Sequence, residues 1–229
     1  LLAAGLVDRF RVVVFPVITG ATGTDRIFDG YPDIALDLVD AGGATGFADL
    51  TLAKVAAEAG VATPSLYKHV GSLAALRREV AVLTVRDLAA TLVDRTLGLS
   101  GPDAVRALTH AMRDYAHTHP GRYAAVQTAP DPDDPDAAEL AAAAGRTVEV
   151  IAAVLRGFDL PDERMVDAVR AVRAGVHGFV TLELGGGFRL PQDLDRSFDV
   201  LVDLLVAGVT ALAADDGRPA GPGDEGPRV

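Results

Sequence analysis

The sequence contains no cysteine, which excludes disulfide bonds, thiolate nucleophiles and metal sites with cysteine ligands. This absence fits the reducing cytoplasm, where we expect the protein to work. The sequence also lacks any stretch that approaches the roughly 20 apolar residues needed to cross a bilayer as a helix. We therefore expect a soluble protein with no membrane partner.

The sequence also has no excess of basic residues over acidic ones. The 21 Lys and Arg residues are outnumbered by 32 Asp and Glu residues, which gives a formal net charge of −11 at pH 7. This charge argues against a protein covered by nucleic acid over its whole surface, but it is compatible with a small DNA-binding surface. The hydrophobic content of 49% and the charged content of 23% are those of an ordinary globular protein.

Residues 1–30 differ in character from the rest of the chain. They contain a β-branched run that ends at Ile18, followed by a Gly- and Thr-rich segment. A nucleotide-binding loop at Gly20–Gly23 would need a following helix and a second parallel strand, which the pattern does not provide. A signal peptide is interrupted by Pro16 and has no small-residue cleavage site. We favour a third interpretation, an N-terminal extension that packs loosely or was added by a misplaced start site.

After one amphipathic helix from about residue 32 to 41, the pattern is that of two short helices joined by a tight turn. Thr51 is a suitable N-cap for the first, and Gly60 supplies the left-handed residue that ends it. Thr63 is predicted to cap the second helix, with Pro64 in its first turn and Leu66 facing inward. Such a pair is a helix-turn-helix, whose second helix fits the major groove of DNA.

These residues resemble the tetracycline-repressor-type (TetR/AcrR) family of transcriptional regulators. The resemblance rests on Leu-Thr-Leu-x-x-Val-Ala-x-x-Ala-Gly-Val-x-x-x-x-Leu-Tyr-x-His, from Leu50 to His69. Further along, Val176-His177-Gly178 resembles the C-terminal domain of a subfamily named for a Trp-His-Gly motif, with valine at the tryptophan position. The resemblance covers roughly residues 31 to 213. It implies an all-α homodimer that binds palindromic operators and is released by a ligand.

The exposed side of the second helix carries hydroxyl, lysine and imidazole groups, which suit phosphate contacts. The resemblance places Tyr67 and His69 on the DNA backbone, which leaves base contacts to Thr63, Ser65 and Lys68. The alternative is that Tyr67 only packs and Lys68 is a solvated charge, but the motif and the geometry together favour DNA contact. The predicted DNA-binding residues are Lys54, Thr63, Pro64, Ser65, Tyr67, Lys68, His69 and Ser72.

A long helix is predicted from about residue 72 to 97, with Ser72 as its N-cap. It leaves the DNA-binding domain for a second domain and is the expected mechanical link between them. Further helices are predicted near 102–118, 136–156, 161–184 and 191–213. We therefore predict an all-α chain: a three-helix helix-turn-helix domain (31–78), a larger helical ligand-binding and dimerisation domain (79–213) and a disordered tail (214–229).

One group of residues has the spacing of a metal site. His110, Asp114 and His117 lie at i, i+4 and i+7 on one helical face, with His119 nearby. The spacing suits a divalent metal, but we favour a solvated polar face or the polar lip of a cavity, and we predict no metal. No serine, histidine and acid form a nucleophile signature, so we expect neither an enzyme nor a cofactor.

A small-molecule pocket between the helices is the more plausible site of the second domain. Its candidate residues are the large or polar-tipped side chains on predicted inner faces, for which core packing is the competing interpretation. His177 stands out because an imidazole in an apolar helix needs a partner: Glu183, a backbone carbonyl or the ligand. The candidates are Met112, Tyr115, Tyr123, Phe158, Met165, His177 and Phe179.

The last two helices are predicted to form a homodimer interface. The first carries small residues that permit close approach: Ala168, Ala171, Ala174, Gly175 and Gly178. The second carries an apolar stripe: Phe198, Leu201, Val202, Leu205 and Val209. Paired about a two-fold axis, they would make a four-helix interface; burial within one chain is the alternative.

The sequence as a whole predicts a ligand-responsive transcriptional regulator, acting as a repressor. It would bind a palindromic double-stranded DNA operator as a homodimer and leave it when a small-molecule effector binds. The alternative is a small-molecule-binding helical protein or an enzyme whose helix-turn-helix is vestigial.

Overall fold

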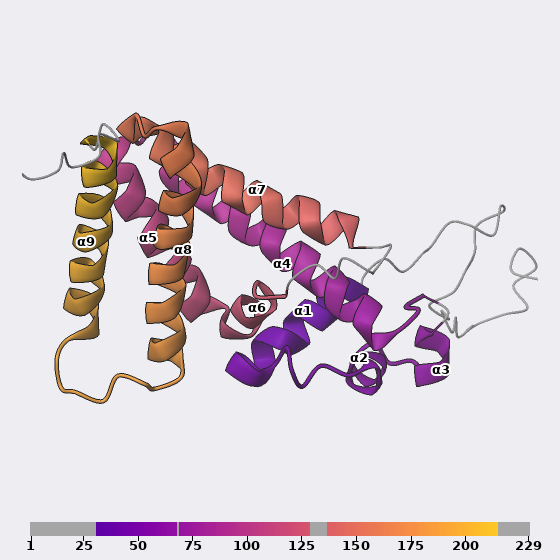
Figure 1. The fold of residues 1–229 in the computed structure, drawn as a ribbon. Coiled ribbons are helices and arrows are strands. Elements are labelled where there is room, and N and C mark those ends of the chain that lie inside the picture. The colour runs from indigo at the N-terminus through magenta and orange to yellow at the C-terminus, as the bar shows by residue number, and fades with distance from the viewer. Residues whose placement is uncertain (1–30, 68, 129–136, 215–229) are drawn as a thin grey trace, which may run out of the picture.

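The computed structural model describes residues 31–67, 69–128 and 137–214, and these residues form an all-helical protein (Figure 1). The predictions for residues 1–30, for Lys68 and for residues 215–229 lie outside the described residues. The elements are α1 (Tyr31–Ala41), η1 (Gly43–Thr45), α2 (Leu52–Glu58), α3 (Thr63–Leu66), α4 (Leu73–Thr96), α5 (Gly101–Thr118), α6 (Pro120–Ala125), α7 (Ala138–Leu155), η2 (Arg156–Phe158), α8 (Asp162–Leu184) and α9 (Leu194–Ala214). The described part of the chain contains no strand, and the predicted fold class is confirmed.

The helix-turn-helix forms at the predicted place, with one difference at the start of α3. Thr51 caps α2, since its Oγ1 accepts a hydrogen bond from the Lys54 amide at 3.3 Å, and Gly60 turns the chain with a φ of +67°. The prediction that Thr63 caps α3 is wrong. The N-cap is Ala62, whose carbonyl accepts a bond from the Ser65 amide at 2.8 Å. The N-cap of α3 therefore lies one residue earlier than predicted.

Helix α4 is shared by two hydrophobic clusters. Its N-terminal half packs with α1, α2 and α3 through residues such as Leu76 and Val80. Its C-terminal half belongs to a second cluster with α5, α7, α8 and α9, which begins at Leu88. Because α1, α5, α6 and α7 all contact α4, its buried residues lie on several faces of the helix.

Helices α8 and α9 lie side by side at one end of the molecule, and α2 and α3 lie at the other end (Figure 1). Contrary to the expectation from the sequence, α9 is long and apolar enough to cross a membrane by length and composition alone. Only 17% of its most apolar window is buried. One face of α9 packs against α5 and α8, so much of its apolar surface remains exposed.

Candidate DNA-binding and ligand-binding sites

Four of the seven predicted DNA-binding residues that the structure describes are exposed to solvent. Tyr67, which directly follows α3, is 55% exposed despite being a large aromatic residue. The other exposed members of the set are Lys54, Pro64 and Ser72. The half-buried members are Thr63, Ser65 and His69. The exposed set therefore surrounds α3, the helix that the motif assigns to the major groove.

Ser72 has a structural role that leaves it able to contact DNA. Its Oγ accepts a hydrogen bond from the Ala75 amide at 3.0 Å, which caps α4 as predicted. This bond does not use the hydroxyl hydrogen, so the same hydroxyl can donate to a phosphate oxygen. The helix N-terminus beside it also favours an anion.

Arg77, which the sequence analysis did not single out, fixes the segment before α2. Its guanidinium donates to the carbonyl oxygens of Ala48 at 2.7 Å and Leu50 at 3.2 Å. These bonds tie the segment that enters the helix-turn-helix to the first turns of α4. No spacing rule could have found them, because the acceptors are backbone atoms 27 and 29 residues away.

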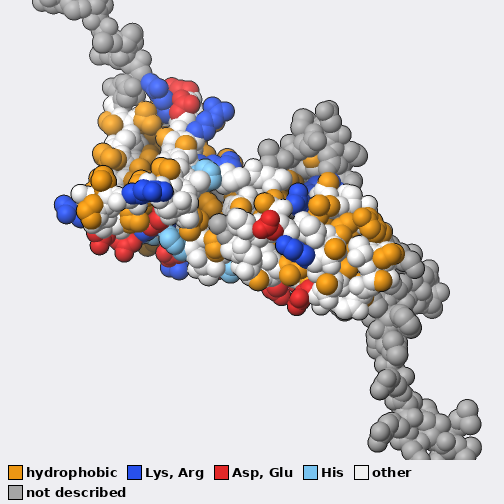
Figure 2. Space-filling model, turned by 90° about the horizontal axis from the view of Figure 1, so that it is seen from below, with side chains coloured by type: hydrophobic (Ala, Val, Ile, Leu, Met, Phe, Trp, Pro, Cys, Tyr) orange, Lys and Arg blue, Asp and Glu red, His pale blue; other side chains and the backbone are white. Residues whose placement is uncertain are grey.

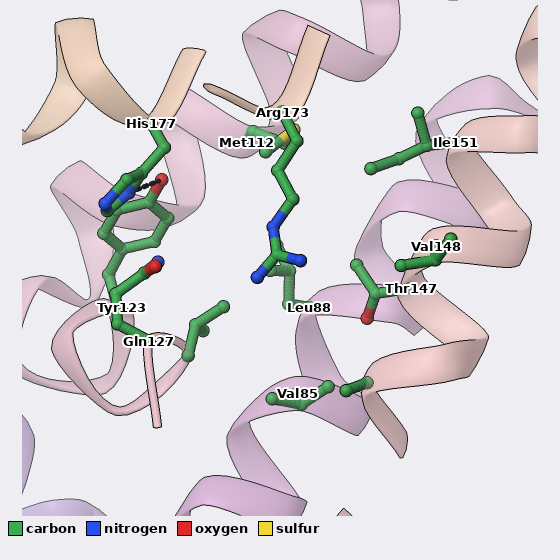
Figure 3. A pocket seen from close by; sticks show the side chains of 12 residues that line it. Val85, Leu88, Met112, Tyr123, Gln127, Thr147, Val148, Ile151, Arg173 and His177 are labelled. Atoms are coloured by element: carbon green, nitrogen blue, oxygen red, sulfur yellow. Dashed lines mark hydrogen bonds between the residues drawn. The ribbon is translucent and has the colours of Figure 1, made fainter. Parts of the chain in front are cut away.

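A small cavity lies between α4, α5, α6, α7 and α8 (Figure 3). Its volume is about 30 Å³, which is roughly the space that one water molecule occupies. The walls are mainly aliphatic and include Val85, Leu88 and Ile151. Drug-sized ligands occupy roughly 300–1,000 Å³, so any such molecule must push the walls of this cavity apart.

Three of the seven predicted ligand-binding residues line this cavity: Met112, Tyr123 and His177. The other four do not line it. Tyr115 is buried and donates to Asp87 at 3.0 Å, and the ring of Phe179 packs against the rings of Phe188 and Phe198. Met165 and Phe158 pack against the hydrophobic core. Side-chain size therefore failed to separate cavity residues from core residues.

Tyr123 and His177 form a pair at one wall of the cavity (Figure 3). The Tyr123 hydroxyl lies 3.2 Å from Nδ1 of His177. Burial raises the pKa of Tyr123 to about 12. Burial, and then the charge of Arg173, lower the pKa of His177. Both groups are therefore uncharged at neutral pH. The partner of His177 Nδ1 in this pair is Tyr123, and not Glu183 or a backbone carbonyl, which the sequence analysis had considered.

The same pair also borders a groove on the outer side of the protein. This groove is lined by α6 and the end of α8, and it has a volume of about 380 Å³. Tyr123, Gln127 and His177 line both the groove and the cavity. The pair thus lies between the small cavity among the helices and the larger outer groove.

A polar network connects α6 with the DNA-binding end of the molecule. Asp40, near the end of α1, lies 3.1 Å from Nδ1 of His119 and 2.8 Å from the guanidinium of Arg122. Arg122 also faces Asp87 of α4 at 3.6 Å. Gly121 lies so close to α1 that a Cβ atom there would overlap the carbonyl oxygen of Val39. Helix α6 is therefore fitted tightly against α1.

The polar face of α5 is used for ion pairs with α8 and α9. Arg113 binds Glu183 through two hydrogen bonds, at 2.9 and 2.5 Å, and their side chains are 12% and 7% exposed. His117 lies 3.0 Å from Glu183, and His110 lies 3.2 Å from Asp199. Each of these histidines thus faces a carboxylate, and the described residues contain no cluster able to hold a metal ion.

Comparison with known proteins identifies the family to which the chain belongs. A family model described as "Tetracyclin repressor-like, C-terminal domain" matches residues 105–205. An uncharacterized HTH-type transcriptional regulator of Mycobacterium tuberculosis is 38% identical over 165 residues, which cover 72% of this chain and 74% of the relative. The chain belongs to the TetR family of transcriptional regulators. A second HTH-type transcriptional regulator, from Bacillus subtilis, is 26% identical over 186 residues, or 77% of this chain and 89% of the relative.

Solved structures of the TetR family share the fold. The transcriptional regulator PfmR from Thermus thermophilus superposes with a TM-score of 0.58 at 19% identity, over 78% of this chain and 98% of that one. A TetR variant from Acinetobacter baumannii, in complex with minocycline, gives a TM-score of 0.60 at 22% identity, over 82% of this chain and 98% of that one. The resemblance to the Trp-His-Gly subfamily of TetR regulators stays a prediction, although its histidine, His177, lines the cavity.

Proposed function

We propose that this TetR-family protein is a ligand-responsive repressor that binds a palindromic operator as a homodimer and is released by a small molecule. It would act in the cytoplasm, where the operator is, and without enzymatic activity. The observation that carries the proposal is the position of α6. Tyr123 of α6 lines the cavity, and the preceding residue, Arg122, holds Asp40 of α1.

DNA binding would use the exposed set around α3. The only two lysines of the chain, Lys54 and Lys68, both fall in the helix-turn-helix segment. The same part of the chain also carries acidic residues, among them Asp49 and Glu58. Because one copy offers few cations to the phosphates, tight binding requires two copies that engage two half-sites.

Dimerisation would use the outer faces of α8 and α9. The stripe that the sequence assigned to the interface, centred on Val202, is turned inward: its members are buried or half-buried against the rest of the chain. The exposed apolar residues of α9 lie one turn apart on a different face: Val200, Leu204, Ala207, Gly208 and Ala211. On α8 the exposed face consists of Ala171, Ala174, Gly178 and Leu182.

These two faces form the kind of surface that a second copy covers. Several hydrophobic side chains are exposed at the end of the molecule that holds α8 and α9 (Figure 2). Leu204 is 65% exposed and Val200 is 52% exposed. Exposed apolar patches on soluble proteins mark interaction sites. A two-fold axis beside the α8–α9 pair would bury both helices in a four-helix interface.

Release of the operator on ligand binding would follow from the small size of the cavity. A ligand that enters must displace its walls, and α6 is the shortest helix among them, with six residues. A displaced α6 moves Arg122 and His119, and with them Asp40 of α1. Since α1 and α4 carry the helix-turn-helix, the spacing of the two recognition helices would change. A coupling free energy of about 1–3 kcal/mol suffices for such regulation.

The test is fluorescence anisotropy on an operator selected from random DNA, over a salt series. We expect selective binding whose logarithm falls linearly with the logarithm of the salt concentration. Tyr67→Ala should weaken binding, and Lys68→Ala should reduce the salt slope of the dimer by about two, one phosphate for each subunit. Leu97→Ala is the matched control, because Leu97 is exposed at the far end of α4. Failure to select any sequence would favour the alternative, a ligand-binding protein with a vestigial helix-turn-helix.

A further inference from the structure

The described lining of the cavity carries one charged side chain, Arg173, which is exposed to solvent. Arg173 of α8 extends into the cavity, with its guanidinium between Gln127 and Thr147 (Figure 3). No Asp or Glu residue that the structure describes lines the cavity. Within the described part of the chain the guanidinium has no ion-pair partner. Its neighbours one turn away on α8 are Val169, Arg170, Val176 and His177, so no intrahelical acid compensates the charge.

A second polar group at the same place also lacks a partner. Oγ1 of Thr147 is buried and makes no hydrogen bond to any described residue. A threonine inside a helix normally bonds to the carbonyl four residues earlier, as Thr118 and Thr210 do at 2.8 Å. A buried hydroxyl without a bond costs free energy. Thr147 of α7 and Arg173 of α8 thus line the same cavity, and neither polar group has a partner among the described residues.

We propose that the cavity binds a monocarboxylate with an aliphatic body, whose carboxylate pairs with Arg173 and accepts a hydrogen bond from Thr147. This inference rests on the proposed function, because it names the chemical class of the effector. A planar guanidinium binds a carboxylate through two parallel hydrogen bonds. The aliphatic body packs among Val85, Leu88 and Ile151, and Met112 also lines the cavity.

The charge balance selects a monoanion over other ligands. Among the described lining residues Arg173 is the only Lys or Arg, and Tyr123 and His177 are uncharged at neutral pH. A phosphate monoester would bring about two negative charges and leave one unmatched among apolar walls, which is unfavourable. A cation would be repelled by Arg173. A carboxylate leaves no net charge behind.

The experiment compares three probes of equal chain length by isothermal titration calorimetry on the full chain: decanoate, decanol and decyltrimethylammonium. We expect decanoate to bind about tenfold more tightly than decanol, and the ammonium compound to bind more weakly than either. Arg173→Gln should abolish the preference for decanoate. Arg170→Gln removes the same charge one turn away, outside the cavity lining, and should preserve the preference.

Three results would overturn the inference: no decanoate binding, equal binding of all three probes, or an undiminished preference in Arg173→Gln. Circular dichroism and a thermal melt of each variant show whether it is folded, and Arg173→Lys provides a milder second variant that keeps the charge. Operator binding of the wild-type protein is measured on the same preparation. A protein that binds decanoate through Arg173 but binds no operator would refute the proposed function and retain the inference. A protein that binds the operator but does not bind decanoate through Arg173 would refute the inference and retain the proposed function.

Discussion

At the scale of single residues, Glu183 is the polar group whose removal should cost the most stability. It accepts two hydrogen bonds from Arg113 and faces His117. The bond from Arg113, followed by that from His117, holds the pKa of Glu183 below its usual range. The pair joins α5 to the end of α8, and its buried position makes each partner depend on the other.

Glu183→Gln should therefore destabilise the fold by about 1–3 kcal/mol at neutral pH, because Arg113 loses its main partner. The pKa of Glu183 is lower in the folded chain than in the unfolded chain. Its contribution is therefore complete above the unfolded pKa and is lost as the pH falls through the folded pKa. We expect the stability difference between wild type and variant to close in acid, as measured by urea unfolding over a pH series.

Glu149→Gln is the control, since the pair of Glu149 with Arg146 is exposed on both sides. Its effect should stay below about 1 kcal/mol at every pH. A stability gap for Glu183→Gln that does not change with pH would show that the carboxylate charge is not what stabilises this contact.

At the scale of elements, the sequence predicted the helices well because each carries its own local signal. Thr51, Gly60 and Ser72 mark helix ends through their own side chains or backbone freedom, and all three act as predicted. The contacts between elements had no such signal. Glu183 and Arg113 are 70 residues apart, and His119 and Asp40 are 79 apart, so only the packed fold brings them together.

The same reason explains which site residues were missed. Arg173 is exposed, as an arginine on an amphipathic helix normally is, and only the packing of α6 and α7 beside it makes it part of a cavity lining. On α9, the sequence contains apolar residues on two faces, and periodicity alone could not tell which face is internal. Phe198 and Val202 proved to be internal, and Leu204 proved to be exposed.

The close fit of α6 against α1 supplies a test at this scale. Gly121→Ala should destabilise the fold by about 1–3 kcal/mol, because its methyl group would overlap backbone atoms at Val39 and Gly43. Gly145→Ala on α7 is the matched control, since a Cβ atom there meets nothing within 4 Å. It should stabilise the fold by about 0.5–1 kcal/mol. Thermal unfolding measures both, and equal effects would contradict the tight α1–α6 contact.

At the scale of the whole molecule, dimerisation sets whether two recognition helices can act together. Leu204→Glu places a charge in the middle of the proposed interface and should raise the dimer dissociation constant on the order of 100-fold or more. Leu97→Glu puts the same charge on a leucine that is 80% exposed elsewhere and should leave the dimer intact. Sedimentation velocity distinguishes the two. A Leu204→Glu protein that remains dimeric would place the interface on another surface.

The central claim is that widening the cavity weakens operator binding, and it can be tested without knowing the effector. Ala144 lines the cavity, whereas Ala142, on the same helix, is exposed. Ala144→Phe forces the walls apart from within, and Ala142→Phe adds the same ring outside; Ala144→Leu is a smaller substitute if phenylalanine unfolds the chain.

The decisive measurement is the operator affinity of these variants by fluorescence anisotropy, with folding and dimer mass verified in parallel. The account predicts that Ala144→Phe weakens operator binding about 5-fold or more, while Ala142→Phe binds like the wild type. A folded, dimeric Ala144→Phe protein with unchanged operator affinity would contradict it.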